Sequence, residues 1–221
     1  MKATDPRENG HRYWDLAAIP QRLVAERTPA ATAMARVMAR ATGLAAGETV
    51  LDLGCGPGAY FRFLRAAVGE SGLVVGVDNS AGMLAKARAR IAREGWDNVI
   101  VEAADATTAE LGVERYDVVI AQYSFSAMPD IGAAVRQAHD ALRPGGRLFV
   151  ADVRLVPGGR TAPLVRLLRA IYRRLAGATG EDVLPYLVET FGSVTHVGRD
   201  GTPVENAVRP WPPLIMLVAT K

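Results

Sequence analysis

Short apolar runs of strand length alternate with longer amphipathic segments through most of this chain. Continuous apolar runs are typical of buried strands, whereas apolar residues that recur every three or four positions indicate a helix packed on one side. The pattern predicts strands at 49–53, 73–77, 98–103, 116–121 and 146–152, and helices at 59–69, 80–94 and 130–142. Strands that alternate with helices form a doubly wound parallel sheet, so the expected fold class is α/β.

Two more apolar runs, SVTHVG and LIMLVATK, follow near the C-terminus. The stretch between them is short, polar and proline-containing, and it cannot hold the crossover helix that parallel neighbours need. We therefore expect the two runs to pair as an antiparallel hairpin that completes a mostly parallel, seven-stranded sheet.

The composition fits a single domain over residues 1–221. A chain of this length buries roughly 70% of its unfolded surface without metal or disulfide support. Apolar residues make up 49% and charged residues 22%, which argues against disorder, and no apolar stretch is long enough to cross a bilayer. The N-terminal sequence MKATDPRENGHRYW has no apolar signal core, so we expect a cytoplasmic protein.

Cys55 is the single cysteine, so an internal disulfide is excluded and no cysteine cluster exists for zinc or an iron–sulfur centre. A lone cysteine fits a reducing compartment. We interpret Cys55 as a small packed residue rather than a reactive thiol, and we expect no metal site.

The stretch VLDLGCGPGAY, from Val50 to Tyr60, is an apolar run that breaks into alternating glycines. Such a run predicts a buried strand followed by a tight turn whose backbone can approach a nucleotide-like ligand. Asp78 comes 20 positions after Gly58 and ends a second apolar run, where a carboxylate can accept hydrogen bonds from ribose hydroxyls. The pattern predicts an adenosine cofactor.

The glycine spacing favours one cofactor class over another. The turn reads G-x-G-x-G, with Pro57 before the last glycine and no glycine that completes G-x-G-x-x-G, which counts against a dinucleotide. Asp52 lies just before the first glycine, where its charge repels a pyrophosphate but suits the ammonium group of a methionine moiety.

Five motifs in order carry a resemblance to a known family. VLDLGCGPG, VVGVDNSAGMLAKAR, VEAADAT, YDVVIAQYSFSAMPD and ALRPGGRLFVADV resemble, in type and spacing, the corresponding segments of class I S-adenosylmethionine-dependent methyltransferases. The resemblance runs from about Ala30 to Lys221. It implies a Rossmann-like methyltransferase fold, for which the C-terminal hairpin is typical, and S-adenosyl-L-methionine as cofactor.

The resemblance also implies roles for individual residues around the methionine and ribose. The backbone at Gly54, Gly56 and Gly58 lines the methionine part, Asp52 faces its amino group, and Asp78 holds the ribose.

At the adenine, the resemblance implies that Asp105 and Ala106 meet the base edge by side chain and backbone amide. Asn79 stands where the family frequently has an apolar residue beside the ribose acid. Met83 is therefore expected to supply part of the packing against the adenine.

The segment after the fourth strand holds the best candidates for contact with the methyl acceptor. Gln122, Tyr123, Ser124 and Ser126 leave the strand beside the expected sulfonium, and Gln122 also counts among the cofactor residues. The alternative for Tyr123 and Phe125 is that they only pack the loop.

The three histidines do not reveal a catalytic base. His139 and His196 are read as structural, on the helix before LRPGG and in the sixth strand. His11 lies on a segment that could fold over the cofactor, although a solvated terminal residue is the alternative. Residues 1–45 are expected to form a helical lid that carries Tyr13 to the site, with docking of this segment on the core as the alternative.

Residues 153–190 are expected to form a helical insertion on the substrate side. From Val153 to Gly180 the chain holds six arginines and no acidic residue, with leucines at helical spacing, which predicts an amphipathic cationic helix. Either it has a solvated face over a core-facing stripe, or it contacts an acidic substrate or an anionic membrane through 160–175.

The basic helix together with YSFSAMPD gives a looser resemblance to small bacterial phospholipid N-methyltransferases and to quinone methyltransferases. A nucleic-acid partner is not expected, because the basic stretch lacks interleaved aromatics and the net charge is only +3. The expected function is S-adenosylmethionine-dependent methylation of a small molecule or lipid head group, with nitrogen slightly ahead of oxygen or carbon. The alternatives are a cofactor-binding member that promotes a non-methylation reaction and a nicotinamide-dependent oxidoreductase.

Overall fold

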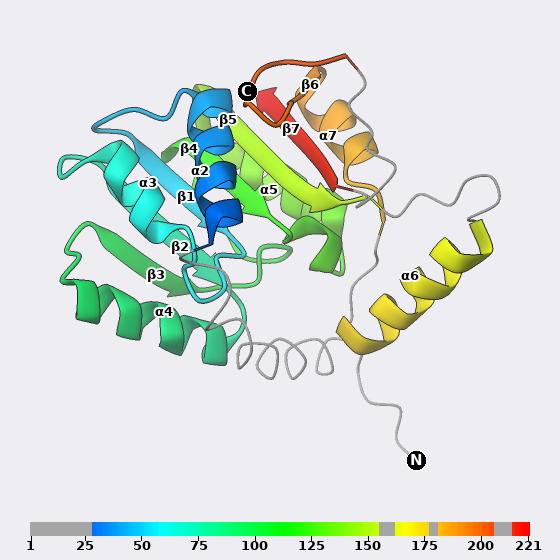
Figure 1. Ribbon diagram of the computed structural model, residues 1–221, viewed down its shortest axis with the longest axis horizontal. Coiled ribbons are helices and arrows are strands. Elements are labelled where there is room, and N and C mark those ends of the chain that lie inside the picture. Colours follow the sequence, from blue (N-terminus) through cyan, green and yellow to red (C-terminus); the bar gives the residue numbers. More distant parts are fainter. Residues whose placement is uncertain (1–27, 155–161, 177–180, 206–213) are drawn as a thin grey trace.

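A computed structural model describes residues 28–154, 162–176, 181–205 and 214–221. In these residues one seven-stranded sheet has the strand order β3-β2-β1-β4-β5-β7-β6 (Figure 1). The strands are β1 (Thr49–Leu53), β2 (Leu73–Asp78), β3 (Val99–Ala103), β4 (Tyr116–Gln122), β5 (Leu142–Val153), β6 (Val194–His196) and β7 (Leu214–Thr220). The predicted α/β sheet is confirmed.

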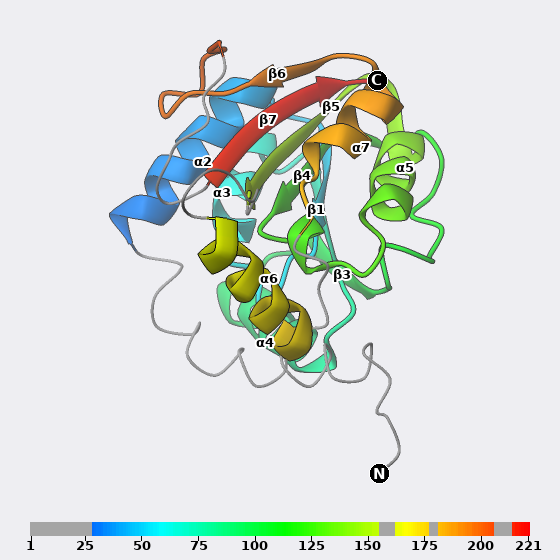
Figure 2. The same cartoon turned by 90° about the vertical axis from the view of Figure 1, so that its right-hand side faces the viewer.

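Helices cover both faces of the sheet. The described helices are α2 (Pro29–Thr42), α3 (Phe61–Val68), α4 (Ala81–Glu94), α5 (Ile131–Ala141), α6 (Ala162–Ala176) and α7 (Leu184–Phe191), with a short 3₁₀ turn η2 (Phe125–Ala127) after β4. All of these helices except α6, which stands apart, pack against the sheet. One apolar core lies between the sheet and α2, α3 and α4, and a second lies between the sheet and α5 and α7 (Figure 2). No helix in the described residues is long and apolar enough to cross a membrane.

The five strands from β1 to β5 are parallel, and β1 pairs with both β2 and β4. The order along the sheet therefore reverses at β1. In open α/β sheets a ligand binds outside the carboxyl ends of the strands at such a reversal. The ends of β1 and β4, with β2 and β3 beside them, define where the site has to be.

The C-terminal hairpin forms as predicted, since β7 runs antiparallel to both β5 and β6. β7 follows β6 in the sequence but lies between β5 and β6 in the sheet.

β5 begins earlier than its apolar run suggested, at Leu142 rather than at residue 146. The extra residues include Leu142, which is fully buried and pairs with Tyr116 of β4, and Gly145, whose backbone is left-handed with φ of 77°. The register against β4 shifts between Tyr116 and Val118, and the Gly145 N–H donates to the carbonyl of Lys221 at 2.9 Å. The Lys221 N–H in turn donates to the carbonyl of Gly146 at 3.0 Å. Burial of Leu142 beside β4 and hydrogen bonds to Lys221, the residue after β7, together extend the strand.

Local capping fixes the helices that follow the site strands. The Ser80 hydroxyl accepts a hydrogen bond from the Met83 N–H at the start of α4, and the Asp130 carboxylate accepts one from the Ala133 N–H at the start of α5. Both residue types favour helix N-termini because their oxygens satisfy backbone donors there. α4 and α5 thus begin close to the carboxyl ends of β2 and β4.

Candidate active site

The glycine turn wraps the carboxyl end of β1 over that of β2. The N–H groups of Gly54 and Cys55 both donate to the carbonyl of Val77, at 2.8 and 3.0 Å. Gly54, Gly56 and Gly58 all have φ between 53° and 73°, the left-handed region that other residues avoid. The turn therefore keeps its backbone close to the neighbouring strand.

Two of the three glycines are also required by close neighbours. A Cβ on Gly54 would lie 2.5 Å from the Cβ of Ser124, and a Cβ on Gly58 would overlap the ring of Phe61. A Cβ on Gly56 would meet only the Met83 sulfur, at 3.9 Å. Gly56 thus faces open space beside Met83, where a ligand can reach the backbone.

Asp78 ties the glycine turn to the next helix. One oxygen of its carboxylate accepts from the Gly56 N–H and the other accepts from the Ser80 N–H, each at 2.8 Å. The side chain is half-buried at the end of β2, so it lies beside the turn as the ribose assignment requires.

Asp52 is a buried carboxyl with an unused oxygen. Its residue is 3% exposed, and Oδ2 has no hydrogen-bond partner among the described residues. Burial, and secondarily the charge of Asp78, raises the pKa of Asp52 to about 7. A buried carboxylate is expensive unless a cation pairs with it. A ligand ammonium group at this position would remove that cost.

Two more buried polar atoms without partners in the described chain lie at the end of β4. They are Oε1 of Gln122 and Oγ of Ser124. In the register of the sheet Asp52 is opposite Ile120, so Gln122 is two residues further along on the same face. Nε2 of Gln122 contacts the sulfur of Met38 from α2. Unsatisfied buried groups are rare in folded proteins, and three at the ends of the paired strands β1 and β4 are consistent with a polar ligand there.

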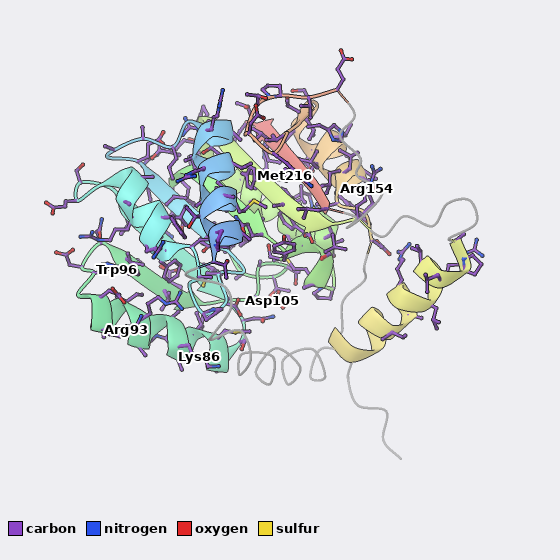
Figure 3. All side chains as sticks on the ribbon, viewed as in Figure 1. Lys86, Arg93, Trp96, Asp105, Arg154 and Met216 are labelled. Atoms are coloured by element: carbon purple, nitrogen blue, oxygen red, sulfur yellow. The ribbon has the colours of Figure 1, made fainter. Side chains whose placement is uncertain are left out.

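The residues expected at the adenine lie one and two strands further along the edge. Asp105 follows β3, which pairs with β2, and its Oδ1 accepts from the N–H and the hydroxyl of Thr107 at 2.9 and 2.7 Å. Ala106 and Met83 are buried, whereas Asn79 is exposed. Figure 3 shows Asp105 on the side toward which the parallel strands run. Met83 is therefore better placed than Asn79 to pack against a base.

Tyr123 has an unusual backbone conformation. A second tyrosine near it, Tyr60, was not singled out in the sequence. Tyr123 has φ of 51° and is 46% exposed. Tyr60, the last residue of the glycine motif, has its pKa raised to about 12 by burial and by the nearby charges of Tyr123 and Asp52. Burial, with Asp152, also raises the pKa of Tyr123. Both phenols stay protonated at neutral pH and can donate hydrogen bonds.

Asp152, which the sequence reading passed over, holds the loop after β4. This fully buried carboxylate ends β5 and accepts from the hydroxyl and N–H of Ser126, at 2.6 and 2.9 Å. Burial raises its pKa, while the hydrogen bonds from Ser126 oppose the rise. The signal for it was available, since it is an acidic residue at the end of an apolar run, as are Asp52 and Asp78. The N–H and the hydroxyl of Ser126 are thus both bound to Asp152 within the loop.

The remaining residues singled out in the sequence occupy structural positions or fall outside the described residues. His139 packs edge-on against Phe191 with ring centroids 5.0 Å apart, and His196 lies in β6, so both occupy structural positions. Cys55 is buried and its thiol has a pKa well above the ordinary value, mainly because of burial. His11 and Tyr13, with most of the expected lid, fall outside the described residues. Among the described residues no group of histidine, cysteine and acidic side chains could hold a metal ion.

Comparison with known proteins identifies the family of this chain. Residues 44–188 match the family described as "Methyltransferase domain". The chain is 35% identical over 148 residues to the 27-O-demethylrifamycin SV methyltransferase of Amycolatopsis mediterranei, which covers 66% of this chain and 52% of that protein. It is 29% identical over 145 residues to the demethylmenaquinone methyltransferase of Lactococcus lactis, over 66% of this chain and 53% of that protein.

Among solved structures, the fold matches phosphoethanolamine N-methyltransferase 2 of Haemonchus contortus with a TM-score of 0.71 and 19% identity, over 88% of this chain and 47% of that one. The looser resemblance to phospholipid and quinone methyltransferases is thus present. The chain spans about half the length of these two curated relatives. The family match covers most of the chain, from residue 44, shortly before β1, to residue 188 in α7. The protein therefore belongs to the methyltransferase domain family.

Proposed function

We propose that this protein transfers a methyl group from S-adenosylmethionine to a small molecule or a lipid head group. The observation that carries the proposal is the buried Asp52 carboxyl, whose Oδ2 has no partner in the described chain and whose pKa is raised to about 7. It lies at the mouth of a glycine turn. A carboxylate in that state suits the ammonium group of an amino acid and repels a pyrophosphate.

The residues around Asp52 fit the rest of such a cofactor. Gly56 leaves open space beside Met83, and Asp78 lies next to the same turn. The unpartnered oxygens of Gln122 and Ser124 can accept from or donate to the amino acid end. The family match at residues 44–188 includes all of these residues and supports the same cofactor.

The bound cofactor supplies a methyl carbon on a positively charged sulfur, which leaves as a neutral thioether. The chain then needs mainly to hold the acceptor in line with that carbon, and well-oriented reactants can reach effective molarities of roughly 10⁵ M or more. Tyr60 and Tyr123 would orient the acceptor by donating hydrogen bonds, because both have raised pKa values.

The same groups favour nitrogen slightly over oxygen as the acceptor atom. Phenols with raised pKa values are poor proton acceptors, and Asp152 is buried and already accepts bonds from Ser126. An amine can lose its proton to water before transfer, whereas a hydroxyl depends more on a positioned base. The curated relatives are named for a rifamycin and a menaquinone precursor, which supports a small organic acceptor but leaves the atom to experiment.

The first test is calorimetric titration of the purified protein with S-adenosylmethionine, S-adenosylhomocysteine and NAD. We expect micromolar binding of the two sulfur compounds and no binding of NAD. Asp52→Asn should weaken binding of both sulfur compounds, with Asp117→Asn, a partly exposed aspartate at the far end of β4, as the matched control. Selective binding of NAD would overturn the proposal in favour of a nicotinamide oxidoreductase.

A second test separates methyl transfer from a cofactor used for another reaction. The protein is incubated with labelled S-adenosylmethionine and a panel of amines, phenols, quinols and phospholipids. We expect S-adenosylhomocysteine to form in step with a labelled product, fastest with an amine. Tight cofactor binding with conversion of an acceptor but without S-adenosylhomocysteine would instead identify a member that promotes a different transformation.

A further inference from the structure

α6 presents an apolar face that the described structure leaves open. Leu164, Leu167 and Ile171 recur at helical spacing and share one side of the helix. They are 57%, 57% and 46% exposed, far more than the side chains that cover the sheet. A stripe of this kind usually packs against something, because exposed apolar side chains gathered on one face mark an interaction site.

The opposite side of α6 is cationic. Arg166 and Arg169 lie about half a turn from the apolar stripe, and Arg166 is exposed. The whole stretch from Val153 to Gly180 holds six arginines and no acidic residue, although the chain as a whole has a net charge of only +3. α6 itself holds four of the chain's 26 lysines and arginines and no acidic residue, so its positive charge is not balanced within the helix.

The position of α6 connects it with the candidate active site. The helix belongs to an excursion that leaves the sheet after β5 and returns before α7. The two ends of the excursion are joined, because Nε of Arg154 donates to Oδ2 of Asp182 at 2.7 Å. Figures 1 and 2 both show α6 standing outward from the carboxyl ends of the parallel strands, and Figure 3 shows Arg154 on that side. A surface bound by α6 would face the mouth of the site.

We propose that α6 docks the protein onto the surface of a membrane that contains anionic lipids. Leucine and isoleucine side chains enter the head-group region, and arginines pair with lipid phosphates. At 15 residues the helix is too short to span a bilayer but suits an amphipathic segment that lies in its surface. The arginines of α6 favour an anionic partner. The apolar stripe favours a partner with an apolar interior, which a membrane has and a nucleic acid lacks. The proposal does not depend on the reaction assigned to the site.

The test is flotation of the full chain with vesicles of phosphatidylcholine alone and with vesicles containing phosphatidylglycerol. We expect binding only to the second kind, weakened by salt. Arg166→Gln with Arg169→Gln should weaken the apparent affinity by at least tenfold, since each arginine near an anionic surface contributes about fivefold. Leu164→Gln with Leu167→Gln should weaken it as much or more, because the apolar face drives insertion.

Matched controls change the same residue types elsewhere. Arg88→Gln with Arg93→Gln removes two exposed arginines from α4, and Val113→Gln with Val188→Gln changes two exposed apolar residues outside α6. Both controls should bind vesicles like the parent. The proposal is overturned if the parent fails to bind anionic vesicles, or if the α6 variants bind as well as the controls. It is also overturned if sedimentation velocity shows a dimer that Leu164→Gln with Leu167→Gln dissociates, because α6 then pairs with a second copy.

Failure of docking and failure of methyl transfer remain distinguishable. Cofactor titration of the α6 variants reports on the glycine turn, which no α6 residue forms. We expect their cofactor affinities to stay within about twofold of the parent while vesicle binding is lost.

Discussion

The two halves of the candidate site are built in different ways. On the β1–β2 side, backbone and side chains of neighbouring strand ends are locked together, as when Asp78 holds both Gly56 and Ser80. On the β4–β5 side, the loop with Tyr123 is partly exposed and one buried carboxylate, Asp152, holds it through Ser126. The rigid β1–β2 side suits an invariant ligand. On the β4–β5 side, exposed residues of the loop can differ while Asp152 still holds Ser126.

Gly54→Ala should have the largest effect, because it disturbs the point where the halves meet. Its Cβ would lie 2.5 Å from that of Ser124, and φ of 73° is already unfavourable for alanine. We expect the free energy of unfolding to fall by about 3–5 kcal/mol from the clash and the left-handed backbone. Gly56→Ala, with similar φ but open space, should cost only about 1–2 kcal/mol. Urea denaturation measures both, and equal losses would contradict the close contact.

Exchanging one carboxylate in each half should separate binding from turnover. Asp78→Asn should weaken binding of S-adenosylmethionine by about 10- to 100-fold, because charge-assisted hydrogen bonds to ribose and turn are lost. Asp152→Asn should leave that affinity within about threefold but lower kcat, because Ser126 loses an acceptor and the loop shifts. Calorimetry and initial rates give the two quantities. A larger binding defect in Asp152→Asn would refute the division.

Acidification should weaken cofactor binding through Asp52. Its pKa is about 7 in the free protein, raised by burial first and Asp78 second, and an ammonium ligand needs the ionised form. Below pH 7 a proton must leave on binding, so Kd should rise by up to about tenfold for each pH unit down to about 5.5.

The Asp52 variant and its neighbour supply the controls for this pH dependence. Asp52→Asn should bind the cofactor weakly at every pH from 7 to 5.5, and its Kd should not change with pH. Asp78→Asn should move the slope to lower pH, since a charge that raises the pKa of Asp52 is gone. A parent profile that stays flat from pH 7 to 5.5 would exclude pairing between Asp52 and the ammonium group.

The stability of the ligand-free protein should also depend on Asp52, but here the protonated carboxyl is favoured, whereas cofactor binding needs the ionised form. Because the folded pKa of Asp52 is raised, the folded protein binds more protons than the unfolded chain between about pH 4 and 7, and stability falls as pH rises through that window. Asp52→Asn should therefore gain stability relative to the parent as pH increases from 5 to 8. Thermal melts at matched ionic strength measure the difference, and a constant difference would contradict the raised pKa.

The smallest expected effects belong to the two phenols. Tyr60→Phe and Tyr123→Phe keep the rings but remove hydroxyls that we expect to orient the acceptor. Each should lower kcat/KM by about three- to tenfold, roughly the value of one hydrogen bond, and leave cofactor affinity unchanged. Initial rates with a competent acceptor measure the effect. If both variants were fully active, these tyrosines would only pack the loop.

How far each half could be predicted from the sequence depends on whether its interacting residues are near or far apart along the chain. Asp52, Gly54 and Asp78 could be proposed as site residues because a glycine that needs positive φ and an acid at a strand end leave local marks in the sequence. The sheet and its hairpin were equally legible in the apolar runs. Asp152 also leaves such a local mark, but its hydrogen bonds to Ser126 and the proximity of Tyr60 to Tyr123 join residues that lie far apart in sequence. The early start of β5 was missed because pairing with Tyr116 and hydrogen bonds to Lys221, both distant in sequence, extend that strand.

The place of β7 in the sheet constrains the order in which the protein can fold. β7 is the last described strand to be synthesised, yet it lies between β5 and β6. Until it emerges, β5 exposes an unpaired edge and β6 has no neighbour, and open edges recruit other chains. The nascent domain therefore has to wait for residues 214–220 before its sheet can close, and a chain without β7 is the form most exposed to aggregation.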